Sequence, residues 1–458
     1  MKPTISRRQF LETTSLAGAG VSLALPKLAS GADSSGSATR LAADKPAKLG
    51  GKPVCSEHFP GWPVYDETEE KALHDTLHSG QWYRGSGKAV AHFEGAFEKL
   101  TGAKHCLATA SGTAALYTAL GALDLGPGDE VIIPPYTFVA TYNAVVLNYA
   151  LPVFVDSDLE SFQIDANKIE AAITKETRAI MPVHLGGYPA DLDKILDISQ
   201  RHKIPVIEDA CQAHLGEWRG RKVGTWGLAG CFSFQASKNL NSGEGGAVLT
   251  NDDQFAKACS AFHNQGRAGK LEGPGFAYSA TRGSNLRLAE FQGGMLSAQM
   301  TRVVEQSNRR NENGKYLTKL LGEIPGIKPA KLYDHATRSA YHLYMFRYDK
   351  AQFAGLDHAG FLAALNAEGV PCSGGYGVMN KEAYVTNLAK NKHFLKIYGE
   401  QKLKDWLERN QNCPENDKLC DQAVWFTQTM LLAERTAMDQ IAEAVRKIQK
   451  HAAQLAKA

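Results

Sequence analysis

The 458-residue sequence has almost no excess of charge of either sign, and this excludes several classes of partner. It carries 51 basic and 48 acidic residues, a formal net charge of +3, with no long block of one sign and no internal repeat. Proteins that hold nucleic acid or anionic membranes by electrostatics need a basic excess. We therefore expect neither partner. The composition, 43% hydrophobic and 22% charged, is typical of a soluble chain of two or three domains.

Signature motifs of several enzyme classes are also missing. Beyond the N-terminus there is no G-x-G-x-x-G after a predicted strand, no Walker P-loop, no cluster of zinc ligands and no G-x-S-x-G elbow. A Rossmann oxidoreductase is therefore a poor interpretation, and no metal is expected. The eight cysteines form no C-x-x-C pair, so reduced and mostly buried thiols are expected, while a Cys413–Cys420 bridge stays open.

Residues 1–32 have the pattern of an export signal. Arg7 and Arg8 precede a weakly apolar stretch over residues 15–25, and small residues follow over 29–32. This order is typical of a twin-arginine signal peptide, and the apolar stretch is too short to span a bilayer. A chance pair of arginines in a disordered tail, which would leave the protein cytoplasmic, is the alternative.

Residues 33–52 have the composition of a linker, so we expect the fold to start near Pro53. The sequence predicts export to the periplasm and a mature protein that begins between Ala29 and Asp44. Retention of the segment as a weak membrane tether is the alternative.

Apolar strands and helices alternate from residue 53 to about residue 300, which predicts a mainly parallel sheet covered on both faces. A long helix, a strand and a final amphipathic helix then predict a smaller α+β domain over 301–458. Residues 376–412 are rich in Lys, Asn and Tyr and are expected to be irregular. Strands are predicted over 131–135, 152–156, 179–183, 205–209, 339–347 and 370–372, and helices over 66–78, 89–100, 139–147, 166–173, 192–202, 292–321, 359–369 and 435–455.

Lys238 lies between a strand-like run over 231–234 and a glycine cluster over 243–246. Alternation places Phe232 and Phe234 on one face of the strand and Ser233 on the other. A lysine fixed beside a tight glycine turn has the partial desolvation, lowered pKa and set direction that Schiff-base chemistry needs. A surface lysine in a hairpin is the alternative for Lys238 considered alone.

The neighbouring motifs fit one small molecule, pyridoxal 5′-phosphate, which needs a lysine, a carboxylate at its ring nitrogen and donors for its phosphate. Asp209 ends a predicted strand and can supply the carboxylate. Ser111-Gly112-Thr113 opens an Ala/Leu helix and, with Ser233, can supply phosphate donors. Phe138 can cover the ring face.

Residues 53–447 resemble the DegT/DnrJ/EryC1/StrS family of sugar aminotransferases, which are fold-type-I pyridoxal-phosphate enzymes. The resemblance implies Lys238 as the Schiff-base lysine, Asp209 at the pyridine nitrogen and Gln212 near the ring hydroxyl. It also implies Gly112, Thr113 and Ser233 at the phosphate, Phe138 stacked on the ring, and Asn285 reaching the phosphate from the other subunit of a homodimer. The matching stretches are residues 79–82, 93–94, 111–116, 135–143, 182–185, 208–214, 232–238, 243–246 and 283–287.

Each of these residues has a simpler alternative. Asp209 could be a helix cap, Gln212 a solvent-facing helix residue and Asn285 a turn residue. His184 ends a predicted strand and either contacts substrate or bonds a loop carbonyl, and His342 is a weaker substrate candidate.

The presence of lysine rather than histidine at position 238 favours transamination over the dehydration catalysed by some relatives. We therefore predict an aminotransferase that moves an amino group from Glu or Gln to a keto-sugar or keto-cyclitol. The amino-acid sequence around Lys238 is similar to that of inosose aminotransferases. A non-catalytic, exported protein that binds the cofactor or a sugar is the alternative, motivated by the export signal.

Overall fold

The computed structural model describes residues 45–56, 58–268, 277–278 and 282–458. The predicted twin-arginine segment and most of the predicted linker lie outside these residues. Within the described part of the chain, no helix has the length and apolar character needed to cross a membrane.

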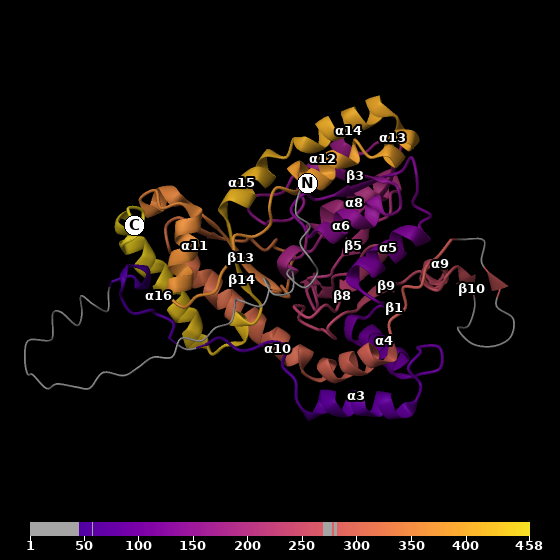
Figure 1. The fold of residues 1–458 in the computed structure, drawn as a ribbon, viewed down its shortest axis with the longest axis horizontal. Helices are drawn as coiled ribbons and strands as arrows, with labels where there is room; N and C mark the ends of the chain where they lie inside the picture. Colours follow the sequence, from indigo (N-terminus) through magenta and orange to yellow (C-terminus); the bar gives the residue numbers. More distant parts are fainter. Residues whose placement is uncertain (1–44, 57, 269–276, 279–281) are drawn as a thin grey trace, which may run out of the picture. The chain divides into compact units, whose positions relative to one another are not determined.

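Seven strands form the central sheet (Figure 1). Two groups of strands, β1-β9-β8-β5 and β4-β2-β3, are joined by isolated parallel bridges at Ile180–Val206 and Val183–Asp209. All strands of this sheet run parallel except β9, so the predicted mainly parallel α/β sheet is confirmed. The strands are β1 (His105–Thr109), β2 (Glu130–Ile133), β3 (Leu151–Phe154), β4 (Thr177–Ile180), β5 (Ile207–Asp209), β8 (Ala229–Ser233) and β9 (Gly246–Thr250).

Helices bury both faces of the sheet, because successive strand residues point to opposite sides. Val131 and Ile133 pack in one cluster with α5 and α6, whereas Ile132 packs in another with α7 and α8. Phe232 and Phe234 pack against α4 on that second side, as the alternation predicted. The helices are α3 (Glu67–Ser79), α4 (Ala89–Thr101), α5 (Gly112–Ala122), α6 (Val139–Val146), α7 (Ala166–Ala172), α8 (Leu192–His202) and α9 (Asp253–His263).

A second core lies around an antiparallel sheet of three strands, β12 (Ile327–Pro329), β13 (Leu343–Tyr348) and β14 (Ala423–Thr427). The predicted strand over 370–372 is wrong: only the next residue, Ser373, forms a bridge, to Trp425. The predicted domain boundary at residue 300 falls inside one long helix, so the division stays a prediction. The helices here are α10 (Glu290–Gly322), α11 (His358–Ala367), α15 (Pro414–Gln422), α16 (Arg435–Lys450) and α17 (Ala452–Leu455).

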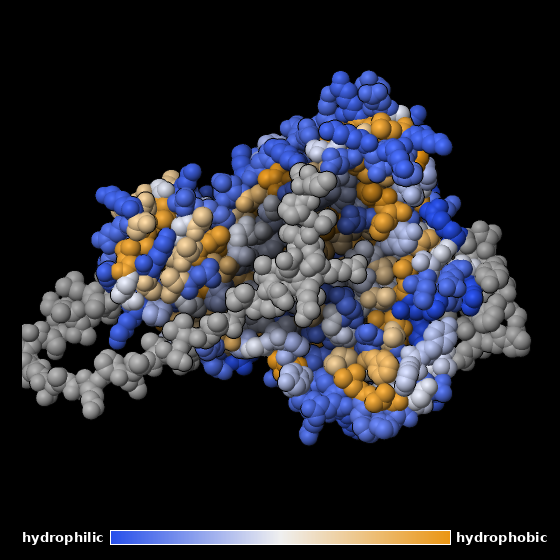
Figure 2. All heavy atoms as spheres, in the orientation of Figure 1, coloured by the Kyte–Doolittle hydropathy of each residue, from blue (hydrophilic) through white to orange (hydrophobic). Residues whose placement is uncertain are grey.

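The expectation that residues 376–412 are irregular is wrong. They form α12 (Ala383–Leu388), α13 (Lys392–Tyr398) and α14 (Glu400–Gln411), and hydrophilic residues predominate over α14 at the upper edge of Figure 2. These helices are short and mostly polar, so each shows too few apolar repeats for a helical period to stand out in the sequence.

The inner side of α14 covers β3, the edge strand of the central sheet. The Trp406 indole Nε1 donates to the Pro152 carbonyl at 2.7 Å, and Asn410 Oδ1 accepts from the Phe154 amide at 2.6 Å. These two backbone groups point away from β2 and would otherwise have no partner in the sheet.

The fold begins earlier than the predicted start near Pro53. Ala47–Leu49 form a 3-10 helix, and the buried Glu368 carboxylate accepts from the amides of Ala47 at 2.8 Å and Val54 at 3.0 Å. Lys447 Nζ lies 3.0 Å from the same carboxylate. A buried ion pair more than 300 residues away orders this segment, and linker-like composition gives no sign of such a partner.

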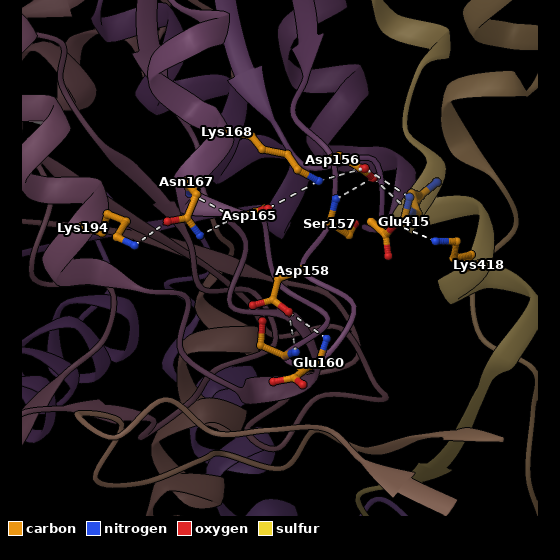
Figure 3. A network of polar contacts seen from close by, with 12 residues as sticks. Asp156, Ser157, Asp158, Glu160, Asp165, Asn167, Lys168, Lys194, Glu415 and Lys418 are labelled. Atoms are coloured by element: carbon orange, nitrogen blue, oxygen red, sulfur yellow. Dashed lines mark hydrogen bonds and ion pairs between the residues drawn. The ribbon is translucent and has the colours of Figure 1, made fainter. Parts of the chain in front are cut away.

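Asp156 connects the end of β3 with the start of α15 (Figure 3). Its carboxylate accepts from the amides of Glu415 at 3.1 Å and Asn416 at 2.9 Å, and Lys168 Nζ lies 3.1 Å away. An acid at a helix N-terminus satisfies free amides and interacts favourably with the helix dipole. This contact fixes the strand that α14 covers to the following helix.

Candidate active site

A cavity of about 450 Å³ opens beyond the carboxyl ends of β5 and β8, where α/β sheets commonly hold ligands. Its walls come from the N-termini of α5 and α6, the loop after β8, and residues of the second sheet and its neighbouring loop. The predicted site residues that line it are Gly112, Thr113, Phe138, Asp209, Gln212, Ser233, Lys238 and His342.

One end of the cavity is formed by the start of α5. Ser111 caps the helix, because its hydroxyl oxygen accepts a hydrogen bond from the Ala114 amide at 3.0 Å. No described residue accepts a hydrogen bond from the amides of Gly112 and Thr113. A Cβ atom at Gly112 would lie 2.6 Å from the Ser233 Cβ, so only glycine allows this close approach. Backbone N–H groups at a helix N-terminus, with two hydroxyls beside them, fit an anion such as phosphate.

Asp209 lies deeper in the cavity and is 4% exposed. Its Oδ2 accepts from the Thr141 hydroxyl at 2.8 Å, and its Oδ1 accepts from the Cys211 amide at 3.2 Å. A carboxylate has about four acceptor positions, so capacity remains for a further N–H donor. Sequence analysis missed Thr141, whose hydroxyl also lies 2.8 Å from that of Thr137.

The glycine cluster fixes the loop that carries Lys238. Gly243 and Gly245 have φ angles of 83° and 155°, and the loop closes through bonds from the Phe234 amide to Gly245 O (2.7 Å) and from the Ala236 amide to Gly243 O (2.9 Å). Burial lowers the pKa of Lys238 below its ordinary value, because desolvation disfavours the charged amine; nearby Cys211 and Asp209 oppose this shift. The structure agrees with the expected desolvation.

His342 lies directly beside this lysine, with its Nε2 3.5 Å from Lys238 Nζ. Asn239 donates through Nδ2 to the Ala340 carbonyl at 2.8 Å, so its Oδ1 is left to accept from His342 Nδ1 at 3.3 Å. His342 therefore carries its hydrogen on Nδ1 and presents the Nε2 lone pair to Lys238. Burial, with the Lys238 charge beside it, lowers the pKa of His342 and keeps the ring neutral. Sequence analysis missed Asn239.

Gln212 is buried in the cavity wall and does not face solvent. Its Oε1 accepts from the Gly186 amide at 2.7 Å, and its Nε2 donates to the Tyr376 hydroxyl at 3.1 Å. Tyr376 and Trp425 line the cavity as well. Sequence analysis missed both, because Tyr376 lies in the segment expected to be irregular and Trp425 within an ordinary buried strand.

The structure places two predicted residues away from the cavity. His184 is fully buried, with Nε2 2.9 Å from Glu208 and Nδ1 accepting from the Ala190 amide at 3.0 Å. Its bonds are all to protein, which favours the structural alternative. Asn285 is exposed and bridges to the Asn264 backbone.

Cysteine chemistry plays no visible part in the geometry. All eight cysteines are free, so the Cys413–Cys420 bridge that the sequence left open is not formed. Cys211 lines the cavity, and burial, with Asp209 nearby, raises the pKa of its thiol well above the ordinary value.

The sequence and structure are similar to known aminotransferases. The model of the DegT/DnrJ/EryC1/StrS aminotransferase family matches residues 63–446. A putative L-glutamine:3-amino-2,3-dideoxy-scyllo-inosose aminotransferase of Streptoalloteichus tenebrarius is 36% identical over 412 residues, 88% of this chain and 98% of that protein. An L-glutamine:2-deoxy-scyllo-inosose aminotransferase of Streptomyces paromomycinus is 34% identical over 89% of this chain and 98% of that one. The crystal structure of 3-amino-5-hydroxybenzoic acid synthase superposes with a TM-score of 0.75 at 32% identity, covering 85% of this chain and 98% of that chain.

Proposed function

Because the chain belongs to the DegT/DnrJ/EryC1/StrS aminotransferase family, we propose that it uses pyridoxal 5′-phosphate to move an amino group. The protein is an aminotransferase of fold-type-I architecture, acting from Gln or Glu on a keto-cyclitol or keto-sugar. The observation that carries the cofactor assignment is the partly buried Lys238 amine, in one cavity with the Asp209 carboxylate and the free amides of α5.

The residues present fit this cofactor. Its phosphate would be held by Gly112, Thr113 and Ser233, in the space that a Cβ atom at position 112 would fill. Asp209 has unused acceptor capacity for a protonated ring nitrogen, and Phe138, 56% exposed at the start of α6, can cover one face of the ring. Bound there, pyridoxal phosphate supplies an electron sink and a carrier for the amino group.

The chain's own groups then divide the remaining work. Lys238 Nζ, neutral more often than an exposed lysine, would hold the cofactor through a covalent bond and would then act as the base that accepts and returns a proton at the reacting carbon. His342 accepts a hydrogen bond from Nζ and so directs it. Asp209 would hold the proton on the ring nitrogen.

The names of two relatives and the polar groups of the cavity wall indicate which amino donor and which ketone acceptor the enzyme uses. Two of the relatives above carry the names of L-glutamine:inosose aminotransferases, which favours L-glutamine as donor and a cyclitol ketone as acceptor here. The cavity walls add hydroxyl and amide groups from Tyr376 and Gln235, which suit a polyhydroxylated ring.

We also propose a homodimer in which Asn285 of the partner subunit reaches the phosphate site. Its exposed position on this subunit supports this arrangement. Export by the twin-arginine route is likewise proposed, supported by Arg7-Arg8 and the segment that follows. That route carries folded proteins and suits an enzyme that binds its cofactor before export.

An absorbance spectrum of the purified protein tests the function. We expect a yellow protein whose visible band disappears on addition of L-glutamine and returns with a keto-cyclitol, and a Lys238→Ala variant that lacks both the band and the activity. A stable band that no amino donor changes would instead favour the non-catalytic alternative. Full activity of Lys238→Ala would exclude the assigned role of the lysine.

A further inference from the structure

Tyr376 is the one residue of the segment 376–412, which the structure describes in full, that lines the cavity. It lies just before α12–α14, the helices that fasten this segment to the central sheet. Tyr142 Oη on α6 donates to the Tyr384 carbonyl at 3.4 Å, and Trp406 Nε1 donates to the Pro152 carbonyl of β3 at 2.7 Å, so the helices are held against both α6 and the sheet. The segment therefore delivers one tyrosine to the site from a fixed support.

The Tyr376 ring is held by two other aromatic rings. Its centroid lies 4.6 Å from that of Trp425 at an interplanar angle of 89°, and 5.6 Å from that of Tyr136 at 70°. Both neighbours are buried. Edge-to-face contacts of this kind are favourable, and the ring cannot turn without displacing a buried neighbour, so the hydroxyl has a fixed position.

The hydrogen-bond pattern around Gln212 determines what this hydroxyl can do. The Gly186 amide donates to Gln212 Oε1, so the amide nitrogen must face Tyr376 and donate to its oxygen. The Tyr376 oxygen is thereby an acceptor, and its own hydrogen remains to be donated. No described residue accepts that hydrogen. Burial raises the pKa of Tyr376 to about 12, so the hydroxyl stays protonated near neutral pH.

We propose that Tyr376 donates its hydrogen bond to an oxygen atom of the ketone substrate, and that it selects polyhydroxylated ring ketones with an oxygen at that position. The proposal rests on the aminotransferase function proposed above. Tyr376 and Trp425 approach the cavity from the second sheet and its loop, whereas the residues assigned to the cofactor come from the central sheet and its helices. An acceptor without the oxygen would leave a buried donor unpaired, and such sites discriminate strongly.

Tyr376→Phe tests this by separating the two half-reactions of the cofactor-loaded enzyme. The ring and its packing are kept, and only the hydroxyl is lost. We expect the L-glutamine half-reaction to stay within about threefold of the parent. The kcat/KM of the half-reaction with 2-deoxy-scyllo-inosose should fall about ten- to a hundredfold. Tyr384→Phe is the matched control, since Tyr384 lies in the same segment and does not line the cavity.

Two results would overturn the proposal. One is an unchanged acceptor half-reaction in Tyr376→Phe. The other is an equal loss in both half-reactions with a shifted visible band, which would place the contact on the cofactor. If the parent enzyme performs neither half-reaction, the proposed function fails, and calorimetric binding of 2-deoxy-scyllo-inosose still decides: weaker binding by Tyr376→Phe supports the contact, and equal binding removes it.

Discussion

Replacement of His342 by phenylalanine should change how Lys238 responds to pH. The neutral imidazole accepts a hydrogen bond from Lys238, and such a bond favours the charged amine. Burial has already lowered the pKa of Lys238, and nearby Cys211 and Asp209 oppose that shift; we expect the hydrogen bond to His342 to oppose it as well. Its removal should therefore lower the lysine pKa further. A net hydrogen bond is worth about 1 kcal/mol, which corresponds to about 0.7 of a pKa unit.

The rate at which apoprotein captures pyridoxal phosphate reports this pKa, because only the neutral amine reacts. Stopped-flow absorbance across a pH series should show the inflection of the His342→Phe variant about 0.7 unit below that of the parent. The plateau rate should also fall, because the amine has lost its direction.

Two further variants make the result specific. His342→Gln can place an amide oxygen near the position of Nε2 and should restore the inflection. His335→Phe is the matched control, since His335 lies 3.7 Å from Asp193 with its side chain half exposed. An inflection that stays in place or rises in His342→Phe would refute the assigned tautomer and the hydrogen bond to Lys238.

Two other predictions come from the structure and a third from the sequence. Asp209→Asn should keep the cofactor bound but lower kcat by about a hundredfold or more, because the ring nitrogen loses its charged partner; a kcat within a few-fold of the parent would remove Asp209 from that role. Trp406→Ala should destabilise the protein by about 3–5 kcal/mol in urea unfolding, since it removes a buried side chain and the donor to Pro152, whereas Tyr65→Ala, at an exposed position, should change little. Substitution of Arg7 and Arg8 by lysine should convert mature periplasmic protein to cytoplasmic precursor on fractionation, and identical full-length cytoplasmic protein in both would mean that the two arginines do not direct export.

Much of the central sheet and the deepest residues of the site followed from local patterns. Each of these residues has a signal within a few positions in the sequence, because the local backbone determines where the side chain lies. The signals are the glycines beside Lys238, the strand end at Asp209 and the serine cap of α5. These positions occupy one cavity, as the parallel topology requires.

The residues that complete the site depend on contacts distant in sequence. Asn239 matters only because Ala340, 101 residues later, fixes its amide. Tyr376 reaches Gln212 across 164 residues, and no local pattern records either pairing. The order of residues 47–54 was missed for the same reason, because it depends on hydrogen bonds to Glu368.

Because α14 covers β3 but is synthesised much later, the edge of β3 stays uncovered for part of translation. Trp406 follows Pro152 by 254 residues, so a ribosome adding roughly 5–20 residues per second completes the strand about 10 to 50 seconds before its covering helix. During that interval the nascent chain exposes an open strand edge, which can pair with neighbouring nascent chains on a polysome. Chaperone demand during translation should therefore fall sharply once residues near 406 leave the exit tunnel, and premature termination before them would leave an aggregation-prone fragment.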